Sequence, residues 1–267
     1  MDLPRLRGGG SILNGRAKVS PSEQDGVTRV CTSVQSFVQM FNKAMDMMVK
    51  TTRPDRKADI LLAAERLFAQ HGYHAVTIRQ IADEAGVPLA LVSYYYGQKH
   101  ELFKAIFDHW RPTVDERLSL LEQTRQAQAP GDMLRRVVEA LVLPVMHLRA
   151  SVEGEYYAQL VARELFYRTP EAVTVLAKHF DPMAHAFIDG LHEACPGSSR
   201  EQAAWAYQFA IGALLHHIID DRVERLSLSK NRAVSPDACT MLIDFIRAGI
   251  AAVLAPPRPS KPRPRTT

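Results

Sequence analysis

Residues 77–102 read TIRQIADEAGVPLALVSYYYGQKHEL, and this stretch decides the fold. Thr77 followed three residues later by Gln80 forms a capping box, the pattern that starts a helix. A glycine ends that helix, and a second short helix is predicted from Pro88 to Tyr95, because proline favours a first helical position. Only about three residues separate the two helices, which is the spacing of a helix-turn-helix.

The residues before this stretch predict a longer amphipathic helix that begins at Asp55 and stops before Gly72, where a left-handed C-terminal residue is easily accommodated. Apolar side chains recur on one face of it at core spacing: Ile60, Leu61, Ala64, Leu67 and Phe68. The helix that starts after Thr77 has its own inward set: Ile78, Ile81, Ala82 and Ala85. A three-helix unit with one shared core is therefore expected.

Beyond Gln98 the segments between helix breakers also read as helices, with no period-two strands and no Asn-Gly hairpin signal. The predicted helices cover residues 98–126, 131–150, 153–167, 170–194, 199–221 and 236–254. Pro112, Pro144 and Pro182 lie inside three of them, and each is expected to kink or split its helix because proline removes a backbone donor. The predicted fold class is all-α.

The chain has 267 residues, 46% hydrophobic and 23% charged, which is enough for one or two globular domains. No apolar run approaches the roughly 20 residues that span a membrane, and the first residues lack the apolar region of a secretory signal. Cys31, Cys195 and Cys239 are odd in number and widely spaced, which argues against disulfides or a zinc cluster. The expectation is a cytoplasmic protein with no membrane partner.

The net charge of +4 comes from the two ends of the chain. Residues 1–54 hold 8 Lys+Arg and 4 Asp+Glu, residues 55–104 hold 6 and 6, residues 105–255 hold 15 and 19, and residues 256–267 hold 4 and 0. The proline-spaced tail PPRPSKPRPRTT either contacts phosphates without sequence preference or is a disordered solubilising segment.

Residues 1–50 are rich in Gly, Ser, Pro and Asn and are predicted to be a disordered extension. Apolar residues at helical spacing appear between Val34 and Met48. Two alternatives are open there: a short amphipathic helix, or a translation start at Met45, Met47 or Met48.

With the preceding ILLAAERLFAQHGYHAV, the stretch at 77–102 resembles the N-terminal domain of the tetracycline-repressor (TetR) family of bacterial transcription regulators. The resemblance rests on an ordered set that includes an aromatic cluster: Gly72, Tyr73, Thr77, Ile81, Ala82, Ala85, Gly86, Val87, Lys99, Glu101 and Leu102. It implies an N-terminal three-helix helix-turn-helix domain and a larger helical ligand-binding and dimerisation domain. The expected organisation is an extension over residues 1–50, a DNA-binding domain over 55–104, an effector-binding and dimerisation domain over 105–255 and a basic Pro-rich tail over 256–267.

In a helix-turn-helix the second short helix enters the major groove and reads bases with its exposed face. Apolar residues at core spacing are excluded, and five candidates for base contacts remain: Arg79, Leu89, Ala90, Ser93 and Tyr94. Only Arg79 can form a bidentate pair with guanine, whereas Leu89 and Ala90 can meet thymine methyl groups. Base readout is therefore expected to be largely apolar.

Phosphate contacts need donors beside that helix. The candidates are the Thr77 hydroxyl with its helix N-terminus, the Tyr95 hydroxyl, and Lys99 at the start of the next helix. In the TetR family the residues that match Tyr95 and Lys99 hold the DNA backbone. Tyr96 is expected to pack inward, as an aromatic residue at this position does in the family.

A dimer interface is predicted in the helices over 199–221 and 236–254, which resemble the pair that forms the four-helix interface of the family. Small and apolar residues suit close packing around a two-fold axis: Gln208, Ile211, Gly212, Leu215, Ile219, Met241, Leu242, Phe245 and Gly249. The alternative is that they only complete the core of one chain. A homodimer is preferred because two reading helices together recognise a palindromic operator.

An effector pocket is the remaining prediction for the second domain. Its apolar wall and polar end are assigned to aromatic, Met, His and Arg side chains: Trp110, Met146, His147, Tyr157, Arg163, Phe166, Phe187 and Phe209. Ordinary core packing accounts for the same residues. Because this half resembles family members that sense lipophilic effectors, a small lipophilic effector is expected to release a repressor from its operator.

No metal, cofactor or catalytic site is predicted. Asp181, His185, Asp189 and His192 share one helical face, but Pro182 interrupts the register, and such a stripe is more typical of a solvated face with paired charges. Phosphate-binding glycine loops, nucleophile elbows and metalloprotease motifs are absent from the sequence. The chain is interpreted as a regulator and not an enzyme. The alternative function is a DNA-binding structural or activator protein with a protein partner and no effector.

Overall fold

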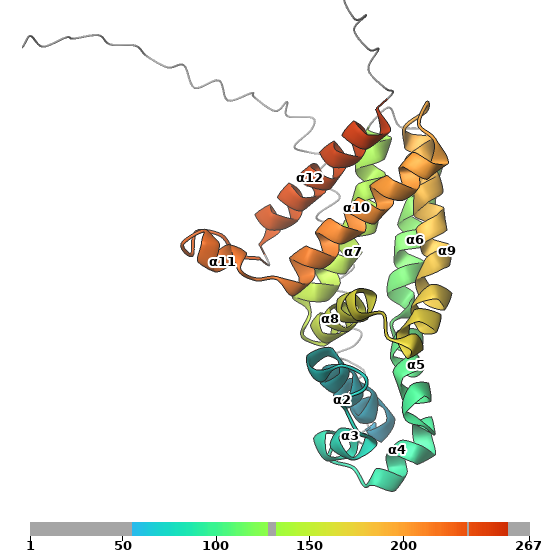
Figure 1. Ribbon diagram of the computed structural model, residues 1–267, viewed down its shortest axis with the longest axis vertical. Helices are drawn as coiled ribbons and strands as arrows, with labels where there is room; N and C mark the ends of the chain where they lie inside the picture. Colours follow the sequence, from blue (N-terminus) through green and yellow to red (C-terminus); the bar gives the residue numbers. More distant parts are fainter. Residues whose placement is uncertain (1–54, 128–131, 234, 256–267) are drawn as a thin grey trace, which may run out of the picture. The chain divides into compact units, whose positions relative to one another are not determined.

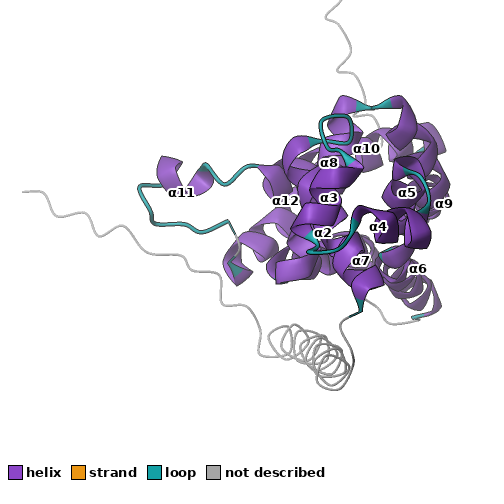
Figure 2. Cartoon of the chain, turned by 90° about the horizontal axis from the view of Figure 1, so that it is seen from below, coloured by secondary structure: helices purple, strands orange, loops and turns teal. Residues whose placement is uncertain are grey.

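The computed structural model describes residues 55–127, 132–233 and 235–255. Every regular element in this part of the chain is a helix, which confirms the predicted all-α class (Figure 2). None of these helices combines the length and apolarity needed to cross a membrane. The predictions for residues 1–50 and for the basic tail over 256–267 fall outside the described residues.

The helix-turn-helix region consists of α2 (Arg56–His71), α3 (Ile78–Glu84) and α4 (Leu89–Tyr96) (Figure 1). The capping box predicted for α3 is present, since Thr77 N donates to Gln80 Oε1 at 2.8 Å and Gln80 N donates to Thr77 Oγ1 at 3.2 Å. Side chains with no exposed surface form the shared core: Ile60, Ala64, Phe68, Ile81 and Val92. Each large one stabilises the fold by about 1.5–3 kcal/mol.

The start of α4 differs slightly from its prediction. Pro88 is the N-cap of α4 and not its first residue, and the helix continues to Tyr96. The turn between α3 and α4 therefore covers residues 85–88, one more than predicted. Gly86 has φ 61° in this turn, a conformation that glycine adopts without steric cost.

The helix predicted over 98–126 is two helices, α5 (Lys99–His109) and α6 (Arg111–Gln126). Trp110 lies between them at φ −88° and ψ 6°, and Pro112 stands in the first turn of α6. Proline has no N–H to donate and its ring crowds the preceding turn, so Pro112 splits the helix as predicted. Pro144 and Pro182 do not split theirs.

The second domain continues with α7 (Met133–Ala150), α8 (Val152–Tyr167), α9 (Pro170–Ala194), α10 (Arg200–Ile219), α11 (Val223–Leu226) and α12 (Pro236–Leu254). The sequence did not predict α11, and it extended α10 to residue 221. Asp220 ends α10 because it is extended (φ −120°, ψ 112°) and accepts hydrogen bonds from Arg222 N at 2.8 Å and Arg222 Nε at 2.8 Å.

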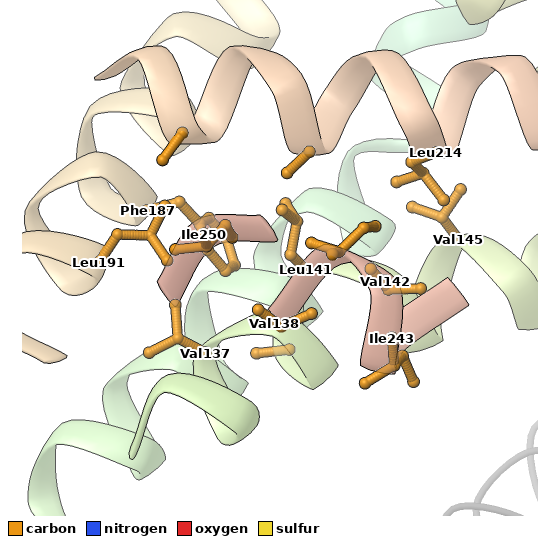
Figure 3. Close-up of a cluster of buried hydrophobic side chains, with 14 of the residues drawn as sticks. Val137, Val138, Leu141, Val142, Val145, Phe187, Leu191, Leu214, Ile243 and Ile250 are labelled. Carbon is orange, nitrogen blue, oxygen red and sulfur yellow. The ribbon is translucent and has the colours of Figure 1, made fainter. Parts of the chain in front are cut away.

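The core of the second domain lies between α7, α9, α10 and α12 (Figure 3). One face of α7 contributes side chains at helical spacing: Val137, Val138, Leu141, Val142 and Val145. They meet Phe187 and Leu191 of α9, Leu214 of α10, and Ile243 and Ile250 of α12. This packing holds α10 and α12 side by side.

Two helix pairs join the helix-turn-helix region to the second domain: α2 packs against α8, and α5 packs against α9. At the end of α2, Gly72 has φ 84°, and Arg163 Nη2 of α8 donates to His71 O at 3.3 Å. A Cβ atom at position 72 would lie 2.7 Å from that Nη2. The φ angle of Gly72 favours glycine, and a side chain at this position would also force the Arg163 guanidinium group to shift.

We expect Gly72→Ala to lower the free energy of unfolding by about 1–3 kcal/mol, because an L-residue is strained at this φ and its methyl group collides with Arg163. Gly86→Ala is the matched control, since Gly86 also has a positive φ but has open space around its Cβ position. Denaturant unfolding measures both. Equal losses at the two positions would show that the Arg163 contact contributes nothing.

Candidate nucleic-acid interface

Most of the side chains of α4 are exposed to solvent. Figure 2 shows α4 beside α3 on the side that faces the viewer. Val92 is its single buried residue. Leu89 is 42% exposed and Tyr94 is 79% exposed, and Ala90 and Ser93 are exposed as well. A helix anchored by one inward side chain and by its neighbouring helices can enter a groove without losing core contacts.

The fifth candidate for a base contact, Arg79, is exposed on the first turn of α3, which packs against α4. Within the described residues it takes part in no ion pair, whereas Arg66 binds Glu84 at 2.8 Å. All five candidates are thus exposed on two adjacent helices. The guanidinium of Arg79 is the one charged group among them.

The predicted phosphate ligands have different surroundings. Thr77 Oγ1 accepts from Gln80 N and lies 2.9 Å from Gln80 Oε1, so its hydroxyl is engaged within the capping box. The Tyr95 ring is 38% exposed and packs edge-on against Tyr94, with 5.2 Å between ring centroids. Tyr96 packs inward as expected, and its hydroxyl donates to Lys57 O at 2.8 Å.

Lys99 is the first residue of α5, and its Nζ lies 4.4 Å from the centroid of the Tyr73 ring. Burial lowers the pKa of Lys99, while the nearby Glu171 carboxylate opposes that effect. The cation–π contact orients the ammonium group. The N-terminus of α5, where backbone N–H groups lack helical partners, adds positive potential at the same place. Lys99 and the α5 N-terminus therefore place positive charge directly after α4.

A buried carboxyl group links this interface to the second domain. Glu65 of α2 is 1% exposed, and Trp110 Nε1 donates to its Oε2 at 2.6 Å. Trp110, which lies between α5 and α6, stacks on Tyr157 of α8 with 5.2 Å between ring centroids and 16° between ring planes. Burial raises the pKa of Glu65 to about 7, with a smaller opposing effect of the Trp110 hydrogen bond and a further rise from Glu153.

A buried histidine also lies at this junction, and neither of its ring nitrogens has a hydrogen-bond partner within the described residues. His179 of α9 is 4% exposed, and its Nε2 lies 3.4 Å from Asp108 Oδ1 of α5. Burial lowers the pKa of His179, which keeps the ring neutral at physiological pH. The helix that carries Lys99 packs against α9 at its far end through the Phe107 ring, whose centroid lies 5.9 Å from that of His179.

The Glu65 contribution to stability should fall as pH rises from about 4.5 to about 7. Its pKa is raised from 4.5 to about 7, so across this window the folded chain keeps a proton that the unfolded chain has released. The difference corresponds to about 3 kcal/mol of unfolding free energy. Glu65→Gln cannot ionise and retains an acceptor for Trp110, so this contribution should be absent from it.

The measured quantity is the difference between wild type and Glu65→Gln in denaturant unfolding at each pH, because histidines with lowered pKa values, such as His179 and His217, act in the opposite direction. Glu84→Gln, at an exposed position of α3, is the control. A difference that does not vary with pH would contradict the assignment.

The predicted effector-pocket residues do not meet in one cavity of the described structure. Met146 and Phe187 belong to the α7–α9 core, and Phe209 is 57% exposed. His147 is half-buried on α7, and Trp110 and Tyr157 stack at the domain junction. Arg163 and Phe166 line a surface hollow of about 690 Å³ formed by α2, α8 and α10. The sequence grouped these residues because they are of similar types. It did not reveal that they lie in different places, because helical spacing does not show which helices pack together.

Three of the four residues that share one face of α9, His185, Asp189 and His192, lie close to polar side chains of this chain. Arg200 Nε donates to Asp189 Oδ1 at 2.7 Å, and Arg200 Nη2 lies 3.4 Å from His185 Nδ1. His192 Nδ1 lies 3.4 Å from Ser198 Oγ. Across the described residues, no group of three or more His, Cys, Asp or Glu side chains is placed to hold a metal ion.

The predicted dimer residues lie on a pair of adjacent helices, α10 and α12. Phe245 is 70% exposed, Met241 58% and Ile219 47%, while Gln208, Gly212 and Gly249 are also exposed and Ile211, Leu215 and Leu242 are half-buried. Trp205, which the sequence did not single out for this face, is 62% exposed and stacks on Phe209 with 5.7 Å between ring centroids. Large apolar groups gathered on one exposed face are typical of an interaction surface.

Sequence reasoning missed Arg117, which is only 7% exposed in the middle of α6. A signal was available: Val114, Arg117 and Leu121 recur at helical spacing, so the arginine occupies a core position between two apolar residues. Both apolar neighbours are buried.

Comparison with known proteins gives matches over both halves of the chain. Residues 60–106 match the family model described as bacterial regulatory proteins, tetR family, and residues 139–249 match the tetracyclin repressor-like C-terminal domain. The HTH-type transcriptional activator FasR of Mycolicibacterium smegmatis is 33% identical over 112 residues, which cover 40% of this chain and 50% of FasR. A transcriptional repressor of Mycobacterium tuberculosis strain H37Rv is 34% identical over 89 residues, 33% of this chain and 44% of that protein.

The chain spans about half the length of the curated relatives it matches. Among solved structures, AmtR of Mycobacterium smegmatis has 22% sequence identity and a TM-score of 0.50, and the match covers 79% of this chain and 100% of that one. This likeness concerns the fold alone. The matched families and relatives are regulators of transcription and not enzymes, as the sequence predicts.

Proposed function

The chain belongs to the TetR family of DNA-binding transcription regulators, and from this premise we propose that it is a homodimeric repressor released from a palindromic operator by a small lipophilic effector. The observation that carries the proposal is the exposed face of α4, where Val92 alone is buried. In the proposed organisation residues 55–104 read DNA, and residues 105–255 bind the effector and dimerise.

In this proposal α4 lies in the major groove and α3 crosses the backbone. Leu89 and Ala90 meet thymine methyl groups, Ser93 and Tyr94 contact neighbouring base edges, and Arg79 pairs with a guanine. Tyr95 and Lys99 bind phosphates on the two sides of the groove contact. Thr77 acts through the N-terminus of α3, because its hydroxyl is engaged by Gln80.

The exposed apolar face of α10 and α12 is proposed as the dimer interface. A two-fold axis through it would bury Phe245, Met241 and Phe209 against their copies in the partner. Gly212 and Gly249 have open space around their Cβ positions, so the partner helices can approach closely there. The two copies of α4 would then read the two halves of a palindrome.

Release from DNA follows from linkage between two sites. An effector that favours one separation of the two copies of α4 lowers the affinity for DNA, and DNA lowers the affinity for the effector by the same factor. A coupling of about 1–3 kcal/mol changes affinity about 5- to 150-fold. The contact of Trp110 with Glu65 and Tyr157 is the path we propose, since it joins the effector domain to α2.

Footprinting of the purified chain on its own upstream DNA, with and without a lipophilic extract of its host, tests this function. A two-fold symmetric footprint that is lost with extract is expected. A footprint that ignores the extract would favour the alternative of a protein partner and no effector. The relatives include an activator and a repressor. A reporter assay with and without the chain shows whether the chain activates or represses transcription.

We expect Lys99→Ala to weaken binding to all sequences alike and to reduce the slope of log affinity against log salt by about one unit, because one phosphate contact is lost. Arg79→Ala should instead relax preference at one base position, at about 1–3 kcal/mol. Electrophoretic mobility shifts over a salt series and an operator library measure both effects. Lys178→Ala, at an exposed position of α9, is the control. A Lys99→Ala protein that chose a different operator would refute the division of roles.

Phe245→Asp should convert the dimer to monomers, because an unpaired carboxylate buried at the interface costs about 3 kcal/mol or more. Sedimentation velocity measures the mass, and palindrome affinity should fall with it. Val152→Asp is the control: Val152 is 84% exposed, at the first position of α8, where an acidic residue suits the helix. A Phe245→Asp protein that sedimented as wild type would exclude this face.

A further inference from the structure

A positive charge is buried in the second domain without a counter-ion. Arg117 of α6 is 7% exposed, and its one hydrogen bond within the described residues runs from Nε to Thr113 O of its own helix, at 3.2 Å. None of the ion pairs in the described part of the chain involves Arg117. Arg149, also buried, differs in that its Nη1 donates to His217 O on another helix.

The groups around Arg117 are aromatic and neutral. Its guanidinium carbon lies 6.0 Å from the centroid of the Phe180 ring of α9. Tyr157 of α8 and Tyr207 of α10 are its electrostatic neighbours, and burial raises the pKa of Tyr207 to about 12 and that of Tyr157 further still. Both phenols therefore keep their protons and do not balance the charge.

The acid next to Arg117 in sequence does not balance it either. Glu116 forms no ion pair within the described residues, and its attraction for Arg117 is the smallest of the effects on the pKa of Arg117. Burial raises the pKa of the Glu116 carboxyl group, an effect larger than the opposing attraction of Arg117. Burial lowers the pKa of Arg117 itself, but a guanidinium remains charged at physiological pH. An uncompensated cation inside a protein destabilises the fold, and a pairing anion removes much of that cost.

We propose that Arg117 binds the carboxylate of a monoanionic effector. The apolar remainder of this effector lies in the core of the second domain. This inference rests on the proposed function and names the chemical class of its effector. The planar guanidinium offers two parallel N–H donors that match a carboxylate, and the hydroxyl groups of Tyr157 and Tyr207 are further donors. A single cation neutralises a single charge, which favours a carboxylate over a phosphate dianion.

The surroundings of Arg117 suit an apolar ligand body. Val114 and Leu121, one turn before and one turn after it on α6, are 2% and 1% exposed. They belong to the same buried cluster as Met183 and Phe187 of α9. Burying each methylene of an acyl chain there adds about 0.8 kcal/mol to binding.

The same site is connected to the DNA-binding helices. Tyr157 is an electrostatic neighbour of Arg117 and stacks on Trp110, and Trp110 donates to Glu65 of α2. Arg117 is only 7% exposed, so a ligand that reaches its guanidinium group must move apart the helices that surround it. That movement displaces Tyr157, and thereby the contact that holds α2.

The first test needs no ligand. Arg117→Met removes the charge and keeps a side chain of similar length, so the melting temperature of the full chain should equal or exceed that of wild type. A fall of about 4 °C or more would show that Arg117 is a satisfied structural residue and would overturn the inference. Arg149→Met is the matched control and should be destabilised, because it leaves His217 O without its donor.

The second test uses decanoate, dodecanoate and hexadecanoate as probes, with the matching alcohols and methyl esters as controls, all below their micellar concentrations. Thermal shift and calorimetry on the full chain should show an acid that binds at least about tenfold more tightly than its alcohol, since a charge-assisted hydrogen bond is worth about 1.5–3 kcal/mol. Arg117→Met should abolish this difference and Arg117→Lys should restore part of it. Equal binding of acid and alcohol, or an acid preference that survives in Arg117→Met, would overturn the inference.

DNA binding separates this inference from the proposed function. Wild type and Arg117→Met should occupy the same operator, and the acid should release wild type only. Release of both proteins by the acid would overturn the role of Arg117 while leaving the repressor function intact. Acid binding that depends on Arg117 in a chain that occupies no operator would support the inference and refute the repressor.

Discussion

The hydrogen bond from Trp110 Nε1 to Glu65 Oε2, at 2.6 Å, is the contact on which the arrangement of the two halves depends. Pro112 interrupts the helix that would otherwise run from α5 into α6, and Trp110 is left at the break. A break in a helix is a flexible point unless something fixes it. Here the indole is held on one side by a buried carboxyl group of α2 and on the other by the Tyr157 ring of α8.

The helix-turn-helix region carries equal numbers of basic and acidic residues, so attraction to DNA must come from where its charges lie. Lys99 is oriented by the Tyr73 ring and stands at the N-terminus of α5, where the helix dipole adds to its charge. Several other charges in this region are paired, as Arg66 is with Glu84. Lys99 therefore places positive charge beside α4, whereas the charge of Arg66 is balanced by Glu84.

The second domain contains two features that a single chain does not satisfy. The face of α10 and α12 exposes large apolar groups such as Phe245, and the contact of these groups with water is unfavourable. Arg117 carries a charge into an apolar core without an anion to balance it. The exposed apolar face suits another copy of the chain, and the buried Arg117 suits an acidic ligand. Tyr157 stacks on Trp110 and is an electrostatic neighbour of Arg117, so it is the side chain that relates the proposed ligand site to the junction with α2.

Sequence reasoning predicted the features that depend on neighbours along the chain. These features are the capping of α3 by Thr77, the split at Pro112 and the inward apolar face of α2. Each depends on residues only a few positions apart, because helix starts, helix breaks and apolar helix faces are local features. The exposure of Leu89 and Tyr94 followed as well, because Val92 had to be the inward residue of so short a helix.

Contacts between distant helices were decided only by the tertiary structure. The sequence grouped Trp110, Tyr157, Phe187 and Phe209 by composition, whereas packing placed two at the domain junction, one in the core and one on the surface. Glu65, Trp110 and Tyr157 come from three separate segments, and no periodicity links them. Burial of Arg117 likewise depends on the packing of α7 and α9 against α6. The sequence alone determined the long helices and their apolar faces, because helix starts, breaks and stripes depend on near neighbours. The packing of those faces determined which charged side chains became buried, because burial depends on contacts between distant segments.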